Sequence, residues 1–162
     1  MIPPALPFFV YGTLRPGGPH HDRYLRGRTG PAEPGRLTGA VLYDGPGYPY
    51  AVAEPSGVVH GDLVTARPEE YGKLLVALDR LEEYVPGDPR SRYERVDRDV
   101  VRGDGSTVRA WVYLAAPAVA ARLRSNGRRI ADGDWRARDA ARTRAEVRAP
   151  RAPRAPRAPR TP

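Results

Sequence analysis

Two adjacent glutamates close the most helix-like stretch of the chain, which runs from Leu74 to Tyr84 and reads LLVALDRLEEY. At about 100° per residue, with Tyr71 placed at zero, Glu82 falls near 20° and Glu83 near 120°. The apolar side chains fall between about 280° and about 40° on the same wheel, and they are Leu74, Leu75, Leu78 and Leu81. Glu82 is therefore predicted to point toward the core and Glu83 toward water. An inward carboxylate is costly unless something uses it, so Glu82 is a candidate functional residue. A frayed helix end that releases the side chain to solvent is the alternative.

A second segment with chemical potential is VYGTL, residues 10–14, where an apolar strand breaks at a glycine. Gly12 has no Cβ, so a ligand can come close to the main chain there. Backbone N–H groups left unpaired at such a break form a concavity that suits a carboxylate. An ordinary turn gives the same pattern, and the segment alone leaves both interpretations open.

Several other kinds of site are excluded by the residues present. The chain has no cysteine, which removes disulfides, thiolate nucleophiles and cysteine-bound metals. It also lacks the GxSxG elbow and the glycine-rich phosphate loops. The histidines are His20 and His21, in a Pro/Gly-rich loop, and His60, in a predicted strand. We interpret the loop pair as solvated and His60 as an ordinary strand residue, and we predict no metal site.

The positive charge is concentrated at the C-terminus. Of the formal net charge of +8, residues 137–162 carry +6, so residues 1–136 carry only +2. Residues 148–162 repeat Arg-Ala-Pro four times and end in Arg-Thr-Pro, and a proline at every third position forbids helices and sheet ladders. We therefore predict a domain at 1–136 and a basic, disordered tail at 137–162.

Nucleic-acid binding is disfavoured as the main function, because the body shows no basic groove or aromatic platform. Weak, salt-dependent contact with polyanions is what we expect of the tail. The first ten residues lack the basic start of a signal peptide, and no stretch is long and apolar enough to span a membrane. A cytoplasmic protein without membrane contact is the expectation.

Length and pattern predict a single α+β domain. Strands are expected at 8–11, 36–43, 51–53, 58–65, 93–101 and 108–114. The principal helix is expected to start in RPEE, residues 67–70, with Pro68 in its first turn. Shorter helices are expected within 21–27 and 117–124, turns at 54–57 (EPSG) and 104–105 (Asp-Gly), and a closing turn that packs Trp135 on the body. Together these elements predict a mixed, barrel-like sheet of about six strands with one principal helix.

Seven motifs between Pro7 and Trp135 resemble, in order and spacing, the gamma-glutamylcyclotransferase-like family. They are VYGTLRPGG, GYP, VVHGDL, LDRLE, YER, AWVYL and IADGDW. Within the family, the chain is most similar to the small single-domain branch that includes the gamma-glutamylamine cyclotransferases.

The resemblance implies a cofactor-independent cyclotransferase of acyltransferase type. Such an enzyme releases 5-oxoproline and an amine or amino acid from a small γ-glutamyl compound. The resemblance makes Glu82, the last residue of LDRLE, the catalytic general acid and base, in agreement with the helical wheel. The substrate-binding positions that it implies are Tyr11, Gly12, Thr13, Leu14, Tyr93 and Tyr113.

Two departures from the family pattern concern the edge of the implied cavity. Glu83 stands where the family often has glycine, and the excursion from Glu83 to Arg92 is longer than in many relatives. The leaving group of the substrate is therefore open. Burial and the neighbouring Glu83 are expected to raise the pKa of Glu82 toward the working pH. A non-catalytic small-molecule binding module of the same fold is the alternative, and the presence of Glu82 argues against it.

Overall fold

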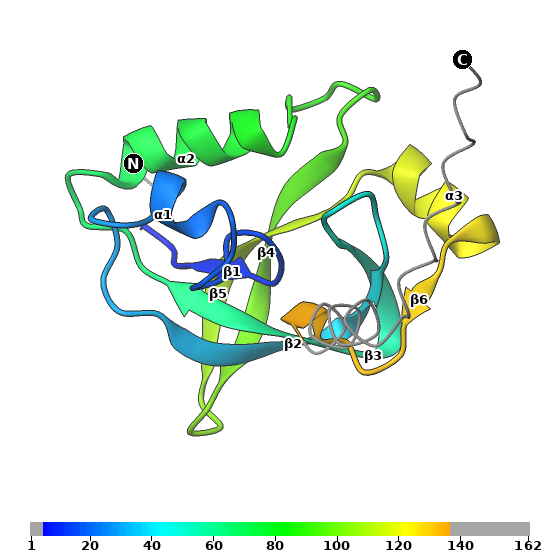
Figure 1. Cartoon of the computed structure of the whole chain (residues 1–162), viewed down its shortest axis with the longest axis horizontal. Coiled ribbons are helices and arrows are strands. Elements are labelled where there is room, and N and C mark those ends of the chain that lie inside the picture. Colours follow the sequence, from blue (N-terminus) through cyan, green and yellow to red (C-terminus); the bar gives the residue numbers. More distant parts are fainter. Residues whose placement is uncertain (1–4, 137–162) are drawn as a thin grey trace, which may run out of the picture.

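The computed structural model describes residues 5–136, and six strands and three helices form within that range (Figure 1). The strands are β1 (Phe8–Val10), β2 (Glu33–Tyr43), β3 (Tyr50–Val64), β4 (Tyr93–Arg102), β5 (Thr107–Ala115) and β6 (Arg129–Ile130). The helices are α1 (His21–Tyr24), α2 (Tyr71–Leu81) and α3 (Pro117–Asn126). The predicted tail at 137–162 lies outside the described residues. No helix within the described range is long and apolar enough to cross a membrane.

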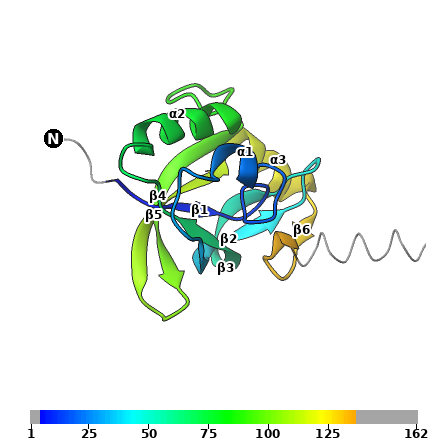
Figure 2. The same cartoon turned by 60° about the vertical axis from the view of Figure 1, so that its left-hand side comes forward.

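Five of the strands close into a barrel. Their order is β3, β1, β5, β4 and β2, and the pairing of β2 with β3 closes the ring, while β6 extends the sheet beyond β2. The pair β1–β5 is parallel and the other pairs are antiparallel. Helix α2 lies across one side of the barrel, and the β4–β5 turn projects from the opposite side (Figure 2). The predicted α+β fold with a mixed, barrel-like sheet is confirmed.

The β2–β3 hairpin corrects one expectation. The segment EPSG, residues 54–57, is not a turn between two strands, because β3 runs without interruption from Tyr50 to Val64. Thr38 pairs with Val58 and Ala40 pairs with Ala53. Residues 54–57 of β3 therefore lie opposite Gly39 alone. They form a large bulge in a continuous strand. Gly39 has a φ of +84°, a backbone conformation that glycine adopts without strain.

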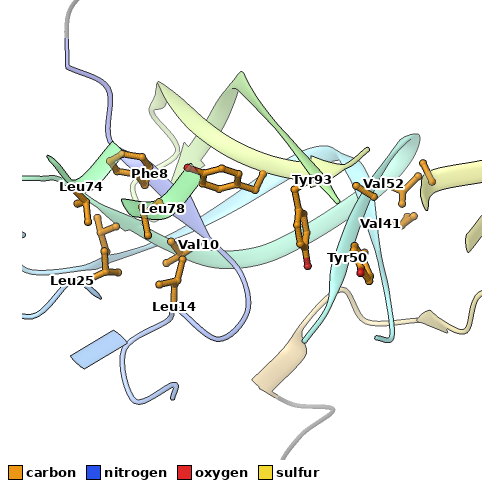
Figure 3. Close-up of a cluster of buried hydrophobic side chains, with 14 residues drawn as sticks. Phe8, Val10, Leu14, Leu25, Val41, Tyr50, Val52, Leu74, Leu78 and Tyr93 are labelled. Atoms are coloured by element: carbon orange, nitrogen blue, oxygen red, sulfur yellow. The ribbon is translucent and has the colours of Figure 1, made fainter. Parts of the chain in front are cut away.

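The apolar face of α2 packs into the core as the helical wheel predicts. Leu74 and Leu78 have no exposed surface, and they contact the cluster that includes Phe8 of β1 (Figure 3). Burying a leucine side chain contributes about 1.5–3 kcal/mol, so this face fixes the helix on the barrel. Tyr93 and Tyr50 lie at the other end of the same cluster, stacked with ring centroids 4.9 Å apart.

Both ends of α2 differ from a simple reading of the sequence. The helix begins at Tyr71 with Glu70 as its N-cap, so Pro68 lies in the preceding turn and not in the first helical turn. At the other end Glu82 is the C-cap, and Glu83 has a left-handed φ of +52°. A left-handed residue just after a helix end is most often glycine. The chain therefore turns sharply away directly after Glu82.

The closing segment packs on the body as expected. Trp135 is 8% exposed and belongs to the second core cluster, with Phe9 and Val59. The N–H of His60 donates to the carbonyl of Gly133 over 2.9 Å, which ties this segment to β3. The predicted packing of Trp135 on the body is confirmed.

Candidate active site

A pocket with a volume of about 200 Å³ lies where the C-terminal end of α2 meets the loop after β1. All of the site residues predicted from the sequence line this pocket. They are Glu82, Tyr11, Gly12, Thr13, Leu14, Tyr93 and Tyr113. The fold therefore gathers residues from four elements, namely the loop after β1, the end of α2, β4 and β5, while their individual roles remain predictions.

The Glu82 side chain is partly buried in this pocket, whereas Glu83 is exposed. No hydrogen bond or ion pair joins the Glu82 carboxylate to another side chain in the part of the chain that the structure describes. Burial raises the pKa of Glu82 from 4.5 to about 7; Glu83 contributes in the same direction and Arg92 opposes it. The predicted inward direction of Glu82 is confirmed, and its pKa is raised in the direction expected from its burial. A carboxylate of this kind can accept and return a proton near neutral pH.

The loop after β1 lines the same pocket with Gly12, Thr13 and Leu14. The carbonyls of Gly12 and Thr13 accept hydrogen bonds from later residues of the loop. The N–H groups of Gly12, Thr13 and Leu14 have no acceptor among the described residues. Three successive N–H groups without acceptors suit the binding of an anion.

The glycine at position 12 also has a packing reason that the sequence did not show. A Cβ at Gly12 would lie 2.7 Å from Cδ of Pro49, closer than side chains tolerate. Pro49 precedes β3 and lines the pocket as well. Gly12 therefore permits the close approach of two walls of the site.

A buried arginine holds this loop in place. Nε of Arg15 donates to Asp62 on β3 over 2.7 Å, and Nη1 donates to Asp134 in the closing segment over 3.0 Å. Arg15 and Asp62 are each 7% exposed. An ion pair so well buried is sensitive to the loss of one partner. Sequence reasoning did not single out Arg15, because its partners are far away along the chain.

Three of the four tyrosines that line the pocket donate their hydroxyl hydrogens to acceptors within the protein. Tyr11 donates to the carbonyl of Tyr113, Tyr93 donates to the carbonyl of Pro49 over 2.9 Å, and Tyr113 donates to Asp79 over 2.6 Å. Burial raises the pKa of all three hydroxyls well above the ordinary tyrosine value. The three hydroxyls therefore stay neutral near neutral pH, and their hydrogen bonds fix the tyrosines as walls of the pocket.

Asp79, the second residue of the LDRLE motif, connects helix α2 to the barrel. Its carboxylate accepts two hydrogen bonds from Arg95 on β4, at 2.8 Å and 3.3 Å, besides the one from Tyr113 on β5. The Arg95 guanidinium also lies 4.3 Å from the centroid of Trp111, within cation–π range. This network fastens the end of α2 to the barrel one helical turn before Glu82, and so positions the carboxylate.

Three polar residues of the pocket were not predicted as site residues, and the environment of one of them, His20, was predicted wrongly. Tyr48, Arg92 and His20 line the pocket. His20 is half-buried, and its ring meets that of Tyr24 edge-on with centroids 5.9 Å apart, so it does not belong to a solvated pair. The reason is that the loop folds back on itself: the N–H of His20 donates to the carbonyl of Thr13. His60 is an exposed strand residue, as interpreted from the sequence.

Arg92 stands at the open edge of the pocket. Its Nε lies 2.8 Å from a carboxylate oxygen of Glu83, and its Nη1 donates to the hydroxyl of Tyr48 over 2.6 Å. The GYP motif supplied the one sequence signal for this contact, since Tyr48 is its central residue. Within residues 5–136, no three His, Asp or Glu side chains lie close enough together to hold a metal ion.

Residues 8–137 match the family model described as gamma-glutamyl cyclotransferase, AIG2-like. Among solved structures, the chain is similar to an uncharacterized protein from Pyrococcus horikoshii, with 23% identity, a TM-score of 0.56, and coverage of 88% of this chain and 98% of that one. It is also similar to a protein from Arabidopsis thaliana, with 26% identity, a TM-score of 0.59, and coverage of 88% and 79%. An AIG2-like protein from Mus musculus matches with 25% identity, a TM-score of 0.54, and coverage of 70% and 81%. No curated protein matches the sequence.

Proposed function

The chain belongs to the gamma-glutamyl cyclotransferase, AIG2-like family, and we propose that it is an active, cofactor-independent γ-glutamyl cyclotransferase. It converts a small γ-glutamyl compound into 5-oxoproline and an amine or amino acid. The observation that carries this proposal is the partly buried carboxylate of Glu82 in a pocket beside three unpaired backbone N–H groups.

The two features suit the two ends of the reacting group. The N–H groups of Gly12, Thr13 and Leu14 bind the α-carboxylate of the glutamyl moiety, which places its α-amine near the γ-carbonyl carbon. Glu82, with a pKa of about 7, accepts one proton from the α-ammonium. General bases work best when their pKa lies near the operating pH.

The chemical step is a ring closure within one molecule. The α-amine attacks the γ-carbonyl carbon, a new C–N bond forms, and the bond from that carbon to the leaving nitrogen breaks. Glu82 returns its proton to the leaving nitrogen. Overall, two protons pass from the α-ammonium to the leaving nitrogen, which departs as an ammonium ion, and the ring nitrogen of 5-oxoproline keeps one hydrogen.

The reaction needs no activated serine or cysteine, because nucleophile and electrophile are parts of the same substrate. Well-oriented intramolecular reactions reach effective molarities of about 10⁵ M or more. The main task of the pocket is therefore to fold the substrate and to exclude competing water. The rigid tyrosine walls fit that task.

The test is the release of 5-oxoproline from a panel of γ-glutamyl amines and γ-glutamyl peptides, measured with the full chain. We expect turnover on at least one compound and its loss in Glu82→Gln. The matched control is Glu94→Gln, an exposed carboxylate on β4, which should retain activity. Turnover by Glu82→Gln, or binding of 5-oxoproline without any turnover by the natural chain, would contradict the proposal.

A further inference from the structure

Arg92 is a charged residue of the pocket to which the proposed mechanism gives no task. Among the described residues that line the pocket, Glu82 has the one carboxylate and Arg92 has the one guanidinium. Glu82 moves protons. Arg92 adds a cation to the lining of the pocket, and a cation there calls for a negatively charged partner in the substrate.

Contacts within the protein hold the Arg92 guanidinium in place but do not occupy all of its N–H donors. It is fixed by the ion pair with Glu83 and by the hydrogen bond to Tyr48, and its backbone N–H donates to the carbonyl of Glu83 over 3.2 Å. A guanidinium has five N–H donors. Its Nη2 group has no acceptor among the described residues, so part of the planar fork stays available to a ligand.

The position of Arg92 indicates which end of the substrate it meets. Its side chain is 41% exposed, whereas Tyr11 and Leu14 beside the backbone N–H groups are 7% and 5% exposed. The enclosed side of the pocket suits the glutamyl moiety, which is common to all substrates. The open side is where the leaving group must lie and depart. Arg92 also acts electrostatically on Glu82, the group that protonates the leaving nitrogen, so the two charges lie near the same part of the substrate.

We propose that Arg92 selects substrates whose leaving group carries a carboxylate beside the scissile nitrogen, as an α-amino acid does. The inference rests on the proposed function and specifies its substrate class. A guanidinium binds a carboxylate through parallel, charge-assisted hydrogen bonds. A plain amine as leaving group offers no such partner.

A pair of substrates that differ by one charge tests the inference. γ-Glutamylalanine carries the carboxylate, and γ-glutamylalaninamide replaces it with a neutral group of nearly the same size. With the natural chain, we expect kcat/KM to be about 10- to 100-fold higher for the acid, the range that a hydrogen bond to a charged group provides. In Arg92→Gln the ratio should fall to about one. Because both substrates meet the same Glu82 within one variant, the ratio is insensitive to a change in the acidity of Glu82.

Arg90→Gln is the matched control. Arg90 lies in the same loop, is exposed, pairs with Asp88 at 3.2 Å and does not line the pocket. This variant should keep the preference of the natural chain. Binding of 5-oxoproline, measured by calorimetry, should be unchanged in Arg92→Gln, because the product lacks the leaving group.

Three results would overturn the inference. Equal kcat/KM for the two substrates with the natural chain would show that the carboxylate is not recognised, while the cyclotransferase activity would stand. Weaker binding of 5-oxoproline to Arg92→Gln would show that Arg92 holds the glutamyl end instead. If neither compound, nor γ-glutamylethylamine, yields 5-oxoproline, the proposed function fails and the selection by Arg92 fails with it.

Discussion

Replacing Glu82 by glutamine should make the protein more stable above neutral pH while it removes the activity. In the folded protein the pKa of Glu82 is raised from 4.5 to about 7, mainly because the carboxylate is buried. The unfolded chain has no such burial. Below about pH 4.5 the carboxyl is protonated in both states and costs nothing. Between pH 4.5 and about 7 the carboxyl ionises readily in the unfolded chain but not in the folded protein, so the stability falls over this range and stays at the lower level above it.

The gain in stability expected for Glu82→Gln follows from the shift in the pKa of Glu82. At 1.36 kcal/mol for each pH unit, the span from 4.5 to about 7 corresponds to at most about 3.4 kcal/mol. Solvent reaches the partly buried side chain through the open pocket, so we expect about 1–2 kcal/mol at pH 8. For a chain of this size that equals an increase in Tm of roughly 2–8 °C.

The assay compares the thermal unfolding of the natural chain and of Glu82→Gln from pH 4 to pH 8.5. The two Tm curves should coincide at the acidic end and separate between pH 4.5 and about 7. Glu94→Gln, at an exposed position, should show no pH-dependent difference. A difference that does not change with pH, or a glutamine variant that is less stable at pH 8, would refute the burial argument. Kinetics give a second reading, since the low-pH limb of kcat/KM should have an apparent pKa of about 7.

Three further predictions concern the surroundings of the pocket. Arg92 lowers the pKa of the Glu82 carboxylate and Glu83 raises it. Arg92→Gln should therefore move the low-pH limb of kcat/KM upward and Glu83→Gln should move it downward, and shifts in the same direction would contradict the proposed role of Glu82. Gly12→Ala places a Cβ 2.7 Å from Pro49 and should push the two walls of the pocket apart. We expect KM to rise about tenfold or more and the stability to fall by about 1–3 kcal/mol. An unchanged KM would mean that the loop does not bind substrate. Removal of residues 139–162 should leave Tm and kcat/KM unchanged, because the repeats contain no large apolar side chain to bury; early unfolding of the shortened chain would mean that this segment packs on the domain.

The part of the site that could be predicted from sequence depends on local geometry. The direction of Glu82 follows from its angle relative to the apolar side chains of one helix, and the break at Gly12 is visible as a glycine after an apolar strand. Both signals lie within a few residues of the feature they describe. The strand order, in contrast, includes the parallel pair β1–β5, whose paired residues Phe8 and Trp111 are far apart along the chain. The sequence pattern of either segment does not indicate which strand it pairs with.

The features that were missed or wrong depend on distant partners. Residues 54–57 read as a turn because Pro, Ser and Gly are turn formers, but the pairing of β3 with β2 continues on both sides and makes them a bulge. Arg92 reads as a solvated loop charge until the fold brings Tyr48, 44 positions away in sequence, within hydrogen-bonding distance. His20 likewise enters the pocket only because the loop folds back on Thr13.

The two ends of the long excursion after α2 meet, and this has a consequence for engineering. The N–H of Arg92 donates to the carbonyl of Glu83, and the hydroxyl of Ser91 bonds both the N–H and the carbonyl of Val85. The tip of the loop between those contacts can thus be exchanged without changing the separation of its anchors, since the entropy of closing a loop depends only weakly on its length. Residues 86–90 are therefore a suitable site for an insertion. A fluorophore or a peptide epitope can be placed there, close to the entrance of the pocket, while Arg92 keeps its position.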